Sequence, residues 1–247
     1  MKLKSSHPAL IEGRPLHNKL RNPEANATPI LKSVASNSKL GKGLGTITKG
    51  RWKGFPLFSL TLAERTTCPK DCLRWAECYG NSMPFAHRFE HGDALESRLR
   101  AEVAYLAHKY PKGFAIRLHI LGDFYSKSYV MFWISLLQQY PNLHVYGYTA
   151  RYGDDIASAI VYGRIKQPER FMIRFSRNEK YTNGSAMIYA AQEGKVSDAI
   201  QCPEQTGKAQ SCLDCGLCWS VNKTITFIDH DKLTQQRKKS NEEVQSA

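Results

Sequence analysis

The sequence predicts an α/β fold in which parallel strands alternate with helices, as in a complete or partial parallel βα barrel. Strand-like and helix-like segments alternate from residue 57 to about residue 176, which is typical of parallel strands joined by right-handed crossovers. The strand-like segments are apolar on both faces, as buried parallel strands are. A doubly wound open sheet is the second arrangement that fits this pattern.

The strands are expected where short apolar runs are bounded by turn residues. The first of them, residues 57–62, alternates apolar and polar side chains. The others are expected over residues 114–121, 143–149, 171–176, 186–189 and 224–229.

Three helices are expected between these strands. Asp93 begins the first, which runs to Tyr110, and Glu96 stands three residues on, as in a capping box. Ser126 caps the second, which ends at Tyr140, before a proline. The third starts at Asp154 or Asp155 and runs to about Arg164.

The composition indicates a folded core and an irregular first segment. Hydrophobic residues make up 42% of the 247 residues, which excludes global disorder, and no apolar run is long enough to span a membrane. The first residues lack the apolar stretch of a secretory signal, so we expect a cytoplasmic protein. We divide the chain into a basic, irregular arm (1–55), a βα core (56–200), a metal-binding segment (201–230) and a charged tail (231–247).

The positive charge is concentrated near the N-terminus. The formal net charge is +13, and residues 1–56 hold eleven Lys and Arg against two Glu, which leaves +9 on the arm and +4 on the rest. A basic, weakly periodic segment commonly binds nucleic acid through its phosphates, so nucleic acid is the expected partner. The alternative is that the arm only aids solubility or packs along the core.

The second of two cysteine groups has the spacing of a metal site. Cys202 is followed by proline, and three more cysteines follow at two-residue intervals: Cys212, Cys215 and Cys218. Three closely spaced cysteines and one remote Cys-Pro resemble the ligands of a four-iron cluster (4Fe-4S). Zinc is the alternative metal, although zinc more often takes its thiolates as separated pairs.

The first group has three cysteines, Cys68, Cys72 and Cys78, in a loop after the first predicted strand. Three thiolates leave one coordination position open, which suits chemistry or an outside ligand. Two alternatives remain: a histidine such as His87 or His91 fills the fourth position, or all seven thiolates share one site.

Polar residues at the ends of later strands are candidates for the active face. Asp123 and Arg151 end successive strands, where the residues of a βα barrel usually act on substrate, and we predict them as catalytic residues. Asp123 is equally placed to cap the helix that begins near Ser126. His119 lies between apolar residues, as a core histidine would, and Trp52, Trp75 and Trp219 either stack bases or pack over the metal loops.

The placement of the first loop resembles radical S-adenosylmethionine (SAM) enzymes. In that superfamily a three-cysteine loop also follows the first barrel strand, and a glycine-rich acidic segment ending the second strand holds the SAM amino group. The resemblance implies a SAM-binding role for Gly122 and Asp123, and a ribose contact for Ser176. The usual spacing there is CX3CX2C, whereas this chain has CX3CX5C, and Tyr79 follows the last cysteine where an aromatic residue usually precedes it.

A closer resemblance is to the phage gene-product-88 family. It is carried by the segments 118–126 (LHILGDFYS), 148–151 (YTAR) and 202–208 (CPEQTGK), with Cys68-Pro69, Cys78-Tyr79, Tyr129-Val130 and the last three cysteines. These cover about residues 55–220. The resemblance implies a metal-thiolate protein of a phage or mobile element.

Two functions therefore fit the sequence. The first is a radical-SAM-like enzyme that acts on nucleic acid, with one or two 4Fe-4S clusters. The second is a nucleic-acid-binding protein without enzymatic activity, whose iron–sulfur or zinc sites are structural.

Overall fold

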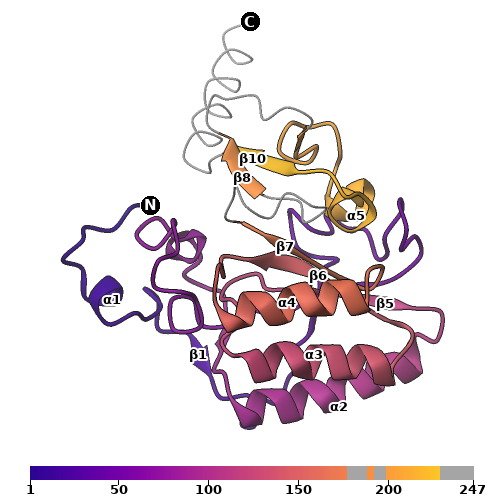
Figure 1. Ribbon diagram of the computed structural model, residues 1–247, viewed down its shortest axis with the longest axis horizontal. Coiled ribbons are helices and arrows are strands. Elements are labelled where there is room, and N and C mark those ends of the chain that lie inside the picture. Colours follow the sequence, from indigo (N-terminus) through magenta and orange to yellow (C-terminus); the bar gives the residue numbers. More distant parts are fainter. Residues whose placement is uncertain (177–187, 192–198, 229–247) are drawn as a thin grey trace, which may run out of the picture.

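A five-stranded sheet forms the centre of the computed structural model, which describes residues 1–176, 188–191 and 199–228 (Figure 1). Its order is β2-β3-β5-β6-β7, with bounds Lys32–Ser33, Leu57–Ser59, Phe114–Leu118, Leu143–Thr149 and Phe171–Phe175. The last four are parallel and lie in chain order, whereas β2 is antiparallel at the edge. The α/β class and the parallel strands are confirmed, but the described strands do not close into a complete barrel.

Three helices cover one face of this sheet (Figure 1). They are α2 (Asp93–Lys109), α3 (Lys127–Gln139) and α4 (Asp155–Lys166). Their buried side chains form one core cluster with alternate residues of the strands, such as Ile116, Val145 and Ile173. Each crossover therefore returns on the same side, unlike the doubly wound arrangement.

The opposite face is covered by the N-terminal arm and the second cysteine segment. Ala115, Tyr146 and Met172 pack there against Trp52 and Trp219 in a second core cluster. The same face carries Arg117, Tyr148 and Arg174 at alternate strand positions. The expectation that the strands are apolar on both faces is thus wrong for this face, because these polar groups meet the cysteine segment instead of helices.

The helix starts follow local capping chemistry in two cases of three. Ser126 accepts a hydrogen bond from the Tyr129 N–H at 3.1 Å, and Asp154 accepts one from the Ala157 N–H at 2.7 Å. Asp93 is not a cap, because the N-cap position belongs to Gly92 (φ 120°), which has no side chain to accept a bond. The Glu96 carboxylate accepts the Tyr125 hydroxyl at 2.8 Å instead of closing a capping box.

The C-terminal part adds a small parallel sheet in the order β8-β10-β9; Figure 1 labels β8 and β10. Its strands are β8 (Ile188–Ala191), β9 (Ile200–Gln201) and β10 (Ile225–Ile228). Of the strand expected over residues 186–189, residues 188 and 189 lie in β8, and residues 186 and 187 lie outside the described residues. The boundary drawn at residue 200 cuts β9, and the tail 231–247 also lies outside the described residues.

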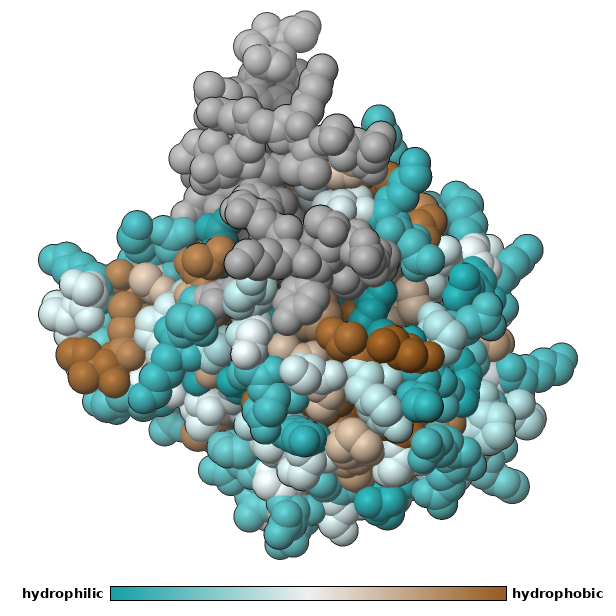
Figure 2. Space-filling view, in the orientation of Figure 1, coloured by the Kyte–Doolittle hydropathy of each residue, from teal (hydrophilic) through white to brown (hydrophobic). Residues whose placement is uncertain are grey.

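The arm is irregular but packs on the core. Its regular elements are α1 (Pro8–Ile11), β1 (Leu20–Arg21) and β2, and β1 pairs with β4 (Arg88–Phe89). Its apolar residues are buried against the sheet and α2, among them Ile30, Val34, Leu40, Ile47 and Trp52. Figure 2 shows hydrophilic side chains over much of the described surface on one face. Among the described residues, no helix is long and apolar enough to cross a membrane.

Candidate metal centre

All seven cysteines line one cavity of about 760 Å³. The cavity lies at the carboxyl edge of the parallel sheet, because residues that follow three neighbouring strands also line it: Gly122 and Asp123 after β5, Ala150 after β6, and Ser176 after β7. This edge is where parallel α/β proteins usually bind ligands. The two cysteine groups, far apart in the sequence, thus line the same cavity.

The first group lies in the loop between β3 and η1 (Tyr79–Ser82), a 3-10 helix. Burial raises the pKa of the Cys68 thiol, and the charges of Asp123, Cys78 and Cys72 raise it further. Burial also raises the pKa of Cys78 to about 11, against an opposing hydrogen bond from the Gly80 backbone. The three thiols therefore lie within electrostatic reach of one another.

The second group is built on two short helices, α5 (Cys212–Cys215) and α6 (Leu217–Ser220). Gly216 joins them in the left-handed region (φ 70°), and a Cβ there would lie 2.7 Å from the Lys49 carbonyl oxygen. This turn places Cys218 beside Cys212. Burial, followed by the charge of Cys218, raises the pKa of Cys212 to about 12.

Cys202 comes from the end of β9 and joins the same group. Burial raises the pKa of its thiol, while hydrogen bonds from the Gln205 and Glu204 backbone lower it. Cys215 likewise has a pKa raised to about 11 by burial, and the Leu217 backbone opposes this shift. Backbone N–H donors aimed at sulfur stabilise a thiolate, which is the form that binds metal.

The donor set fits a soft, thiolate-held metal group. Thiols outnumber carboxylates and histidines around the cavity, and soft sulfur ligands select iron–sulfur clusters or zinc. Within the part of the chain that the structure describes, no three His, Cys, Asp or Glu side chains converge on a single metal ion. The cysteines are therefore gathered in two groups but do not form a finished ligand sphere.

Tyr148 and two arginines connect the sheet to the second group. The Tyr148 hydroxyl donates a hydrogen bond to the Cys218 sulfur at 2.7 Å. The Arg117 guanidinium lies over the Tyr148 ring, 5.7 Å from its centroid. Arg174 donates to the Cys218 carbonyl at 2.7 Å and to the Lys223 carbonyl at 3.0 Å, so it fixes the backbone of this segment.

These positions can be compared with known proteins. The family model described as gene product 88 matches residues 29–224, which include all seven cysteines and the whole five-stranded sheet. The chain belongs to the gene product 88 family. This confirms the closer of the two resemblances stated from the sequence.

Two phage proteins show how far the gene product 88 similarity extends. The Gene 88 protein of Mycobacterium phage D29 is 24% identical over 140 residues, which cover 48% of this chain and 55% of the relative. The Gene 88 protein of Mycobacterium phage L5 is 24% identical over 139 residues, with the same coverage. The chain thus spans about half the length of the curated relatives it matches. No solved structure matches.

Asp123 holds together the strand ends of this gene product 88 protein. Its carboxylate accepts hydrogen bonds from the Phe124 N–H at 2.7 Å, the Thr149 hydroxyl at 2.8 Å and the Ala150 N–H at 2.7 Å. Burial raises its pKa to about 6, although these bonds oppose the shift. Ser126, and not Asp123, caps α3. Asp123 lines the cavity, and its contact with a ligand stays a prediction.

The other predicted residues differ in their relation to the cavity. Arg151 is not among its lining residues; it donates to the Phe124 carbonyl at 2.8 Å and the Thr67 carbonyl at 2.9 Å. It thereby ties the start of the first cysteine loop to β5. Ser176 lines the cavity, and its hydroxyl donates to the Thr149 carbonyl at 2.8 Å. A Cβ on Gly122 (φ 83°) would lie 2.7 Å from the Thr67 hydroxyl oxygen.

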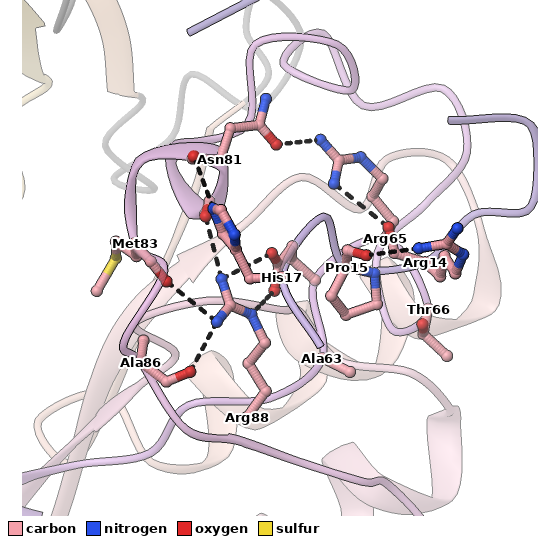
Figure 3. A network of polar contacts seen from close by, with 12 residues as sticks. Arg14, Pro15, His17, Ala63, Arg65, Thr66, Asn81, Met83, Ala86 and Arg88 are labelled. Carbon is pink, nitrogen blue, oxygen red and sulfur yellow. Dashed lines mark hydrogen bonds and ion pairs between the residues drawn. The ribbon is translucent and has the colours of Figure 1, made fainter. Parts of the chain in front are cut away.

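A buried polar network supports the first cysteine loop (Figure 3). Arg88 forms a bidentate ion pair with Glu64 and donates to the Gly80 carbonyl at 3.0 Å. Arg65 donates to the Asn81 side-chain oxygen at 2.6 Å and to the Trp75 carbonyl at 3.0 Å. The guanidinium groups of Arg88 and Arg65 thus hold the loop that carries Cys72 and Cys78.

The histidines do not complete the first group. Neither His87 nor His91 lines the cavity; His87 is exposed, and His91 packs against the Tyr125 ring at 4.9 Å. His119 lines it but is buried and bonded to the Tyr129 hydroxyl at 3.2 Å. Burial lowers its pKa to about 3, so the ring is neutral.

The tryptophans pack within the protein. Trp52 and Trp219 are buried and stack on each other, with ring centroids 5.5 Å apart, so neither presents a face to a base. Trp75 lines the cavity, and its indole N–H donates to the Leu10 carbonyl at 3.2 Å.

Sequence reasoning missed Arg117, Arg174, Glu64 and Arg88. The signal for the first two was present, because they interrupt apolar strands at alternate positions. The Glu64–Arg88 pair joins residues 24 apart and has no local pattern.

Proposed function

We propose that this gene product 88 protein is an iron–sulfur protein whose clusters are held by its two cysteine groups. The observation that carries the proposal is the gathering of all seven thiols around one cavity at the carboxyl edge of the sheet. Stray buried thiols would be expected at scattered sites in the core. Seven thiols at one ligand-binding edge indicate a thiolate-bound group instead.

The two groups have different proposed roles. Cys202, Cys212, Cys215 and Cys218 would supply four thiolates, enough for a closed site. Cys68, Cys72 and Cys78 would supply three and leave one position open. A four-iron cluster in the open site would supply one-electron reduction and a coordination position for an outside ligand.

The chain's own residues around the open position define what that ligand meets. Gly122, Asp123 and Ser176 line the same cavity as the three cysteines. Each is the residue that the radical-SAM resemblance assigns to SAM, so SAM is the proposed ligand. Arg151 would act as a positioning residue, because it fixes the Thr67 carbonyl next to Cys68. The cysteine spacing differs from the superfamily pattern. This difference argues against SAM cleavage but not against cluster binding.

Anaerobic purification after iron-replete expression tests the proposal. We expect a brown protein with broad absorption at about 400 nm, with iron and acid-labile sulfide bound. A colourless protein that holds only stoichiometric zinc would contradict it. Incubation of the reduced protein with SAM, followed by an assay for 5′-deoxyadenosine, then tests the enzymatic role separately.

A second candidate is a nucleic-acid-binding protein in which the same sites are structural. The observation in its favour is that the arm buries its apolar residues while its basic side chains, such as Lys4, Lys19, Lys42 and Lys53, are exposed. Phosphate contacts from such lysines would bind DNA or RNA with little sequence preference and with strong salt dependence. Binding without 5′-deoxyadenosine formation would favour this candidate.

A further inference from the structure

The second cysteine group meets a polar part of the sheet that the proposed ligand set does not use. Tyr148 and Arg117 project from neighbouring strands, β6 and β5, toward the cysteine segment, and both line the cavity. The Tyr148 hydroxyl donates to the Cys218 sulfur at 2.7 Å. Tyr148 therefore contacts a sulfur that would hold the metal group.

Arg117 adds a positive charge beside the same sulfurs. Its guanidinium interacts electrostatically with Cys212 and Cys218 and lies over the Tyr148 ring. Its buried Nε has no hydrogen-bond partner among the described residues.

The positive charge of Arg117 is not neutralised by a carboxylate among the described residues. The acidic residues that line the cavity are engaged elsewhere: Glu64 pairs with Arg88, Glu77 with Arg74 and Lys2, Glu204 with Lys39, and Asp123 accepts bonds from strand ends. Among the described residues, no ion pair joins a carboxylate to Arg117. The anions that would balance the Arg117 charge are the thiolates that Cys212 and Cys218 form when they bind metal.

We propose that Tyr148 and Arg117 tune the C-terminal site for electron transfer, by raising the reduction potential of the cluster held by Cys202, Cys212, Cys215 and Cys218. This inference rests on the proposed function. A hydrogen bond to a ligand sulfur and a nearby cation both stabilise the reduced cluster, which carries one more negative charge. The C-terminal site is then a redox centre and not only a structural metal site.

The test is an EPR-monitored redox titration of the full-length, anaerobically purified protein. Tyr148→Phe removes the hydroxyl and keeps the ring. We expect roughly tenfold less reduced cluster at a given potential, a negative shift of about 59 mV for a one-electron couple. Arg117→Gln is expected to shift the potential in the same direction, and Arg117→Lys, which keeps the charge, to restore most of it. Tyr125→Phe is the matched control, because that hydroxyl donates to Glu96 on the helix-covered side.

The signal of the C-terminal cluster is the one that survives in a Cys68→Ser, Cys72→Ser, Cys78→Ser variant. If this triple variant does not fold, the EPR signals of both clusters are followed in Tyr148→Phe and Arg117→Gln with all seven cysteines present. The reduction potential of only one cluster is then expected to shift. Unchanged potentials in Tyr148→Phe and Arg117→Gln, with clusters bound, overturn this inference and leave the proposed function standing. Loss of the C-terminal cluster from both folded variants also overturns it. Absence of iron from the wild type overturns the proposed function itself, and zinc in the C-terminal group overturns the redox role, since zinc does not change oxidation state.

Discussion

Glu64 and Arg88 form a buried bidentate ion pair directly beneath the first cysteine loop, with nitrogen–oxygen distances of 2.6 and 3.0 Å. Both side chains are almost fully excluded from solvent. The remaining Arg88 donors bind carbonyl groups of Gly80, Met83 and Ala86, so the pair is also the anchor of the chain after Cys78. The loop that carries the open cysteine group is thus held in part by a buried charge pair.

Removal of one partner of this pair should be strongly destabilising. Arg88→Met leaves the Glu64 charge buried without compensation, which costs about 3–5 kcal/mol in comparable pairs. Urea unfolding monitored by circular dichroism measures the loss. Lys2→Ala is the control, because the Lys2–Glu77 pair is largely exposed and should contribute less than about 1 kcal/mol. A cost for Arg88→Met as small as that of the control would contradict the anchoring role.

Substitution of Gly122 should lower the free energy of unfolding, because of its backbone conformation and the close packing around it. Gly122→Ala places a Cβ at a positive φ, which costs about 1–2 kcal/mol, and that Cβ would lie 2.6 Å from the Leu62 Cβ. The resulting overpacking adds about 1–3 kcal/mol. Gly54→Ala has a positive φ but open space, so it should show the φ cost alone. Equal unfolding free energies for the two variants would show that the contact with Leu62 relaxes freely.

His119 should make the apoprotein sensitive to acid. Its folded pKa of about 3 lies below the usual value of 6.5, so the stability it contributes is present above pH 6.5 and is lost as the pH falls. The loss reaches roughly 3 kcal/mol by about pH 4. Asp123 acts with the opposite sign, because its folded pKa is raised and its contribution is lost as the pH rises through about 6.

The comparison of His119→Gln with the wild type isolates the histidine from Asp123. The variant should lose less stability between pH 7 and pH 4, as measured by denaturant titration at each pH. His108→Gln is a control on the exposed end of α2 and should follow the wild type. Parallel profiles for the wild type and His119→Gln would mean that the pKa of His119 is the same in the native and the unfolded state, which would contradict this prediction.

The two cysteine groups should differ in their effect on folding. Cys212→Ser or Cys218→Ser should reduce both metal content and soluble yield, because α5 and α6 connect Leu213 and Trp219 of the second core cluster to the metal. Cys68→Ser or Cys78→Ser should lose metal but keep more of the fold, since the Glu64–Arg88 pair holds that loop independently. Metal analysis and thermal unfolding measure both. Equal loss of soluble protein from the two sets would remove this division.

The basic arm should bind nucleic acid through exposed lysines and not through a detachable segment. Deletion of residues 1–50 would not be a clean test, because Ile30, Val34 and Ile47 belong to the core. Combined replacement of Lys4, Lys19, Lys42 and Lys53 by Gln should weaken DNA or RNA binding and flatten its salt dependence, with metal content unchanged. Fluorescence anisotropy across a salt series measures this. No affinity of the wild type at low salt would contradict the nucleic-acid role.

The sequence by itself determined the elements and the donor set of this protein. The helices at Ser126 and Asp154 and the strand at 143–149 could be predicted because capping bonds and apolar runs are local. The cysteine spacing indicated two thiolate groups for the same reason, since each group lies within a short loop.

The tertiary structure decided which residues share the site. It brought the cysteines near residues 70 and 210 to one sheet edge, placed the Tyr148 hydroxyl on the Cys218 sulfur, and bonded Arg151 to the Phe124 and Thr67 carbonyls. It also decided between the alternatives left open for the arm, because Trp52 and other apolar arm residues pack on a sheet face. These outcomes depend on contacts between residues distant in the chain, and the buried polar groups had to find partners there because burial without a partner is costly.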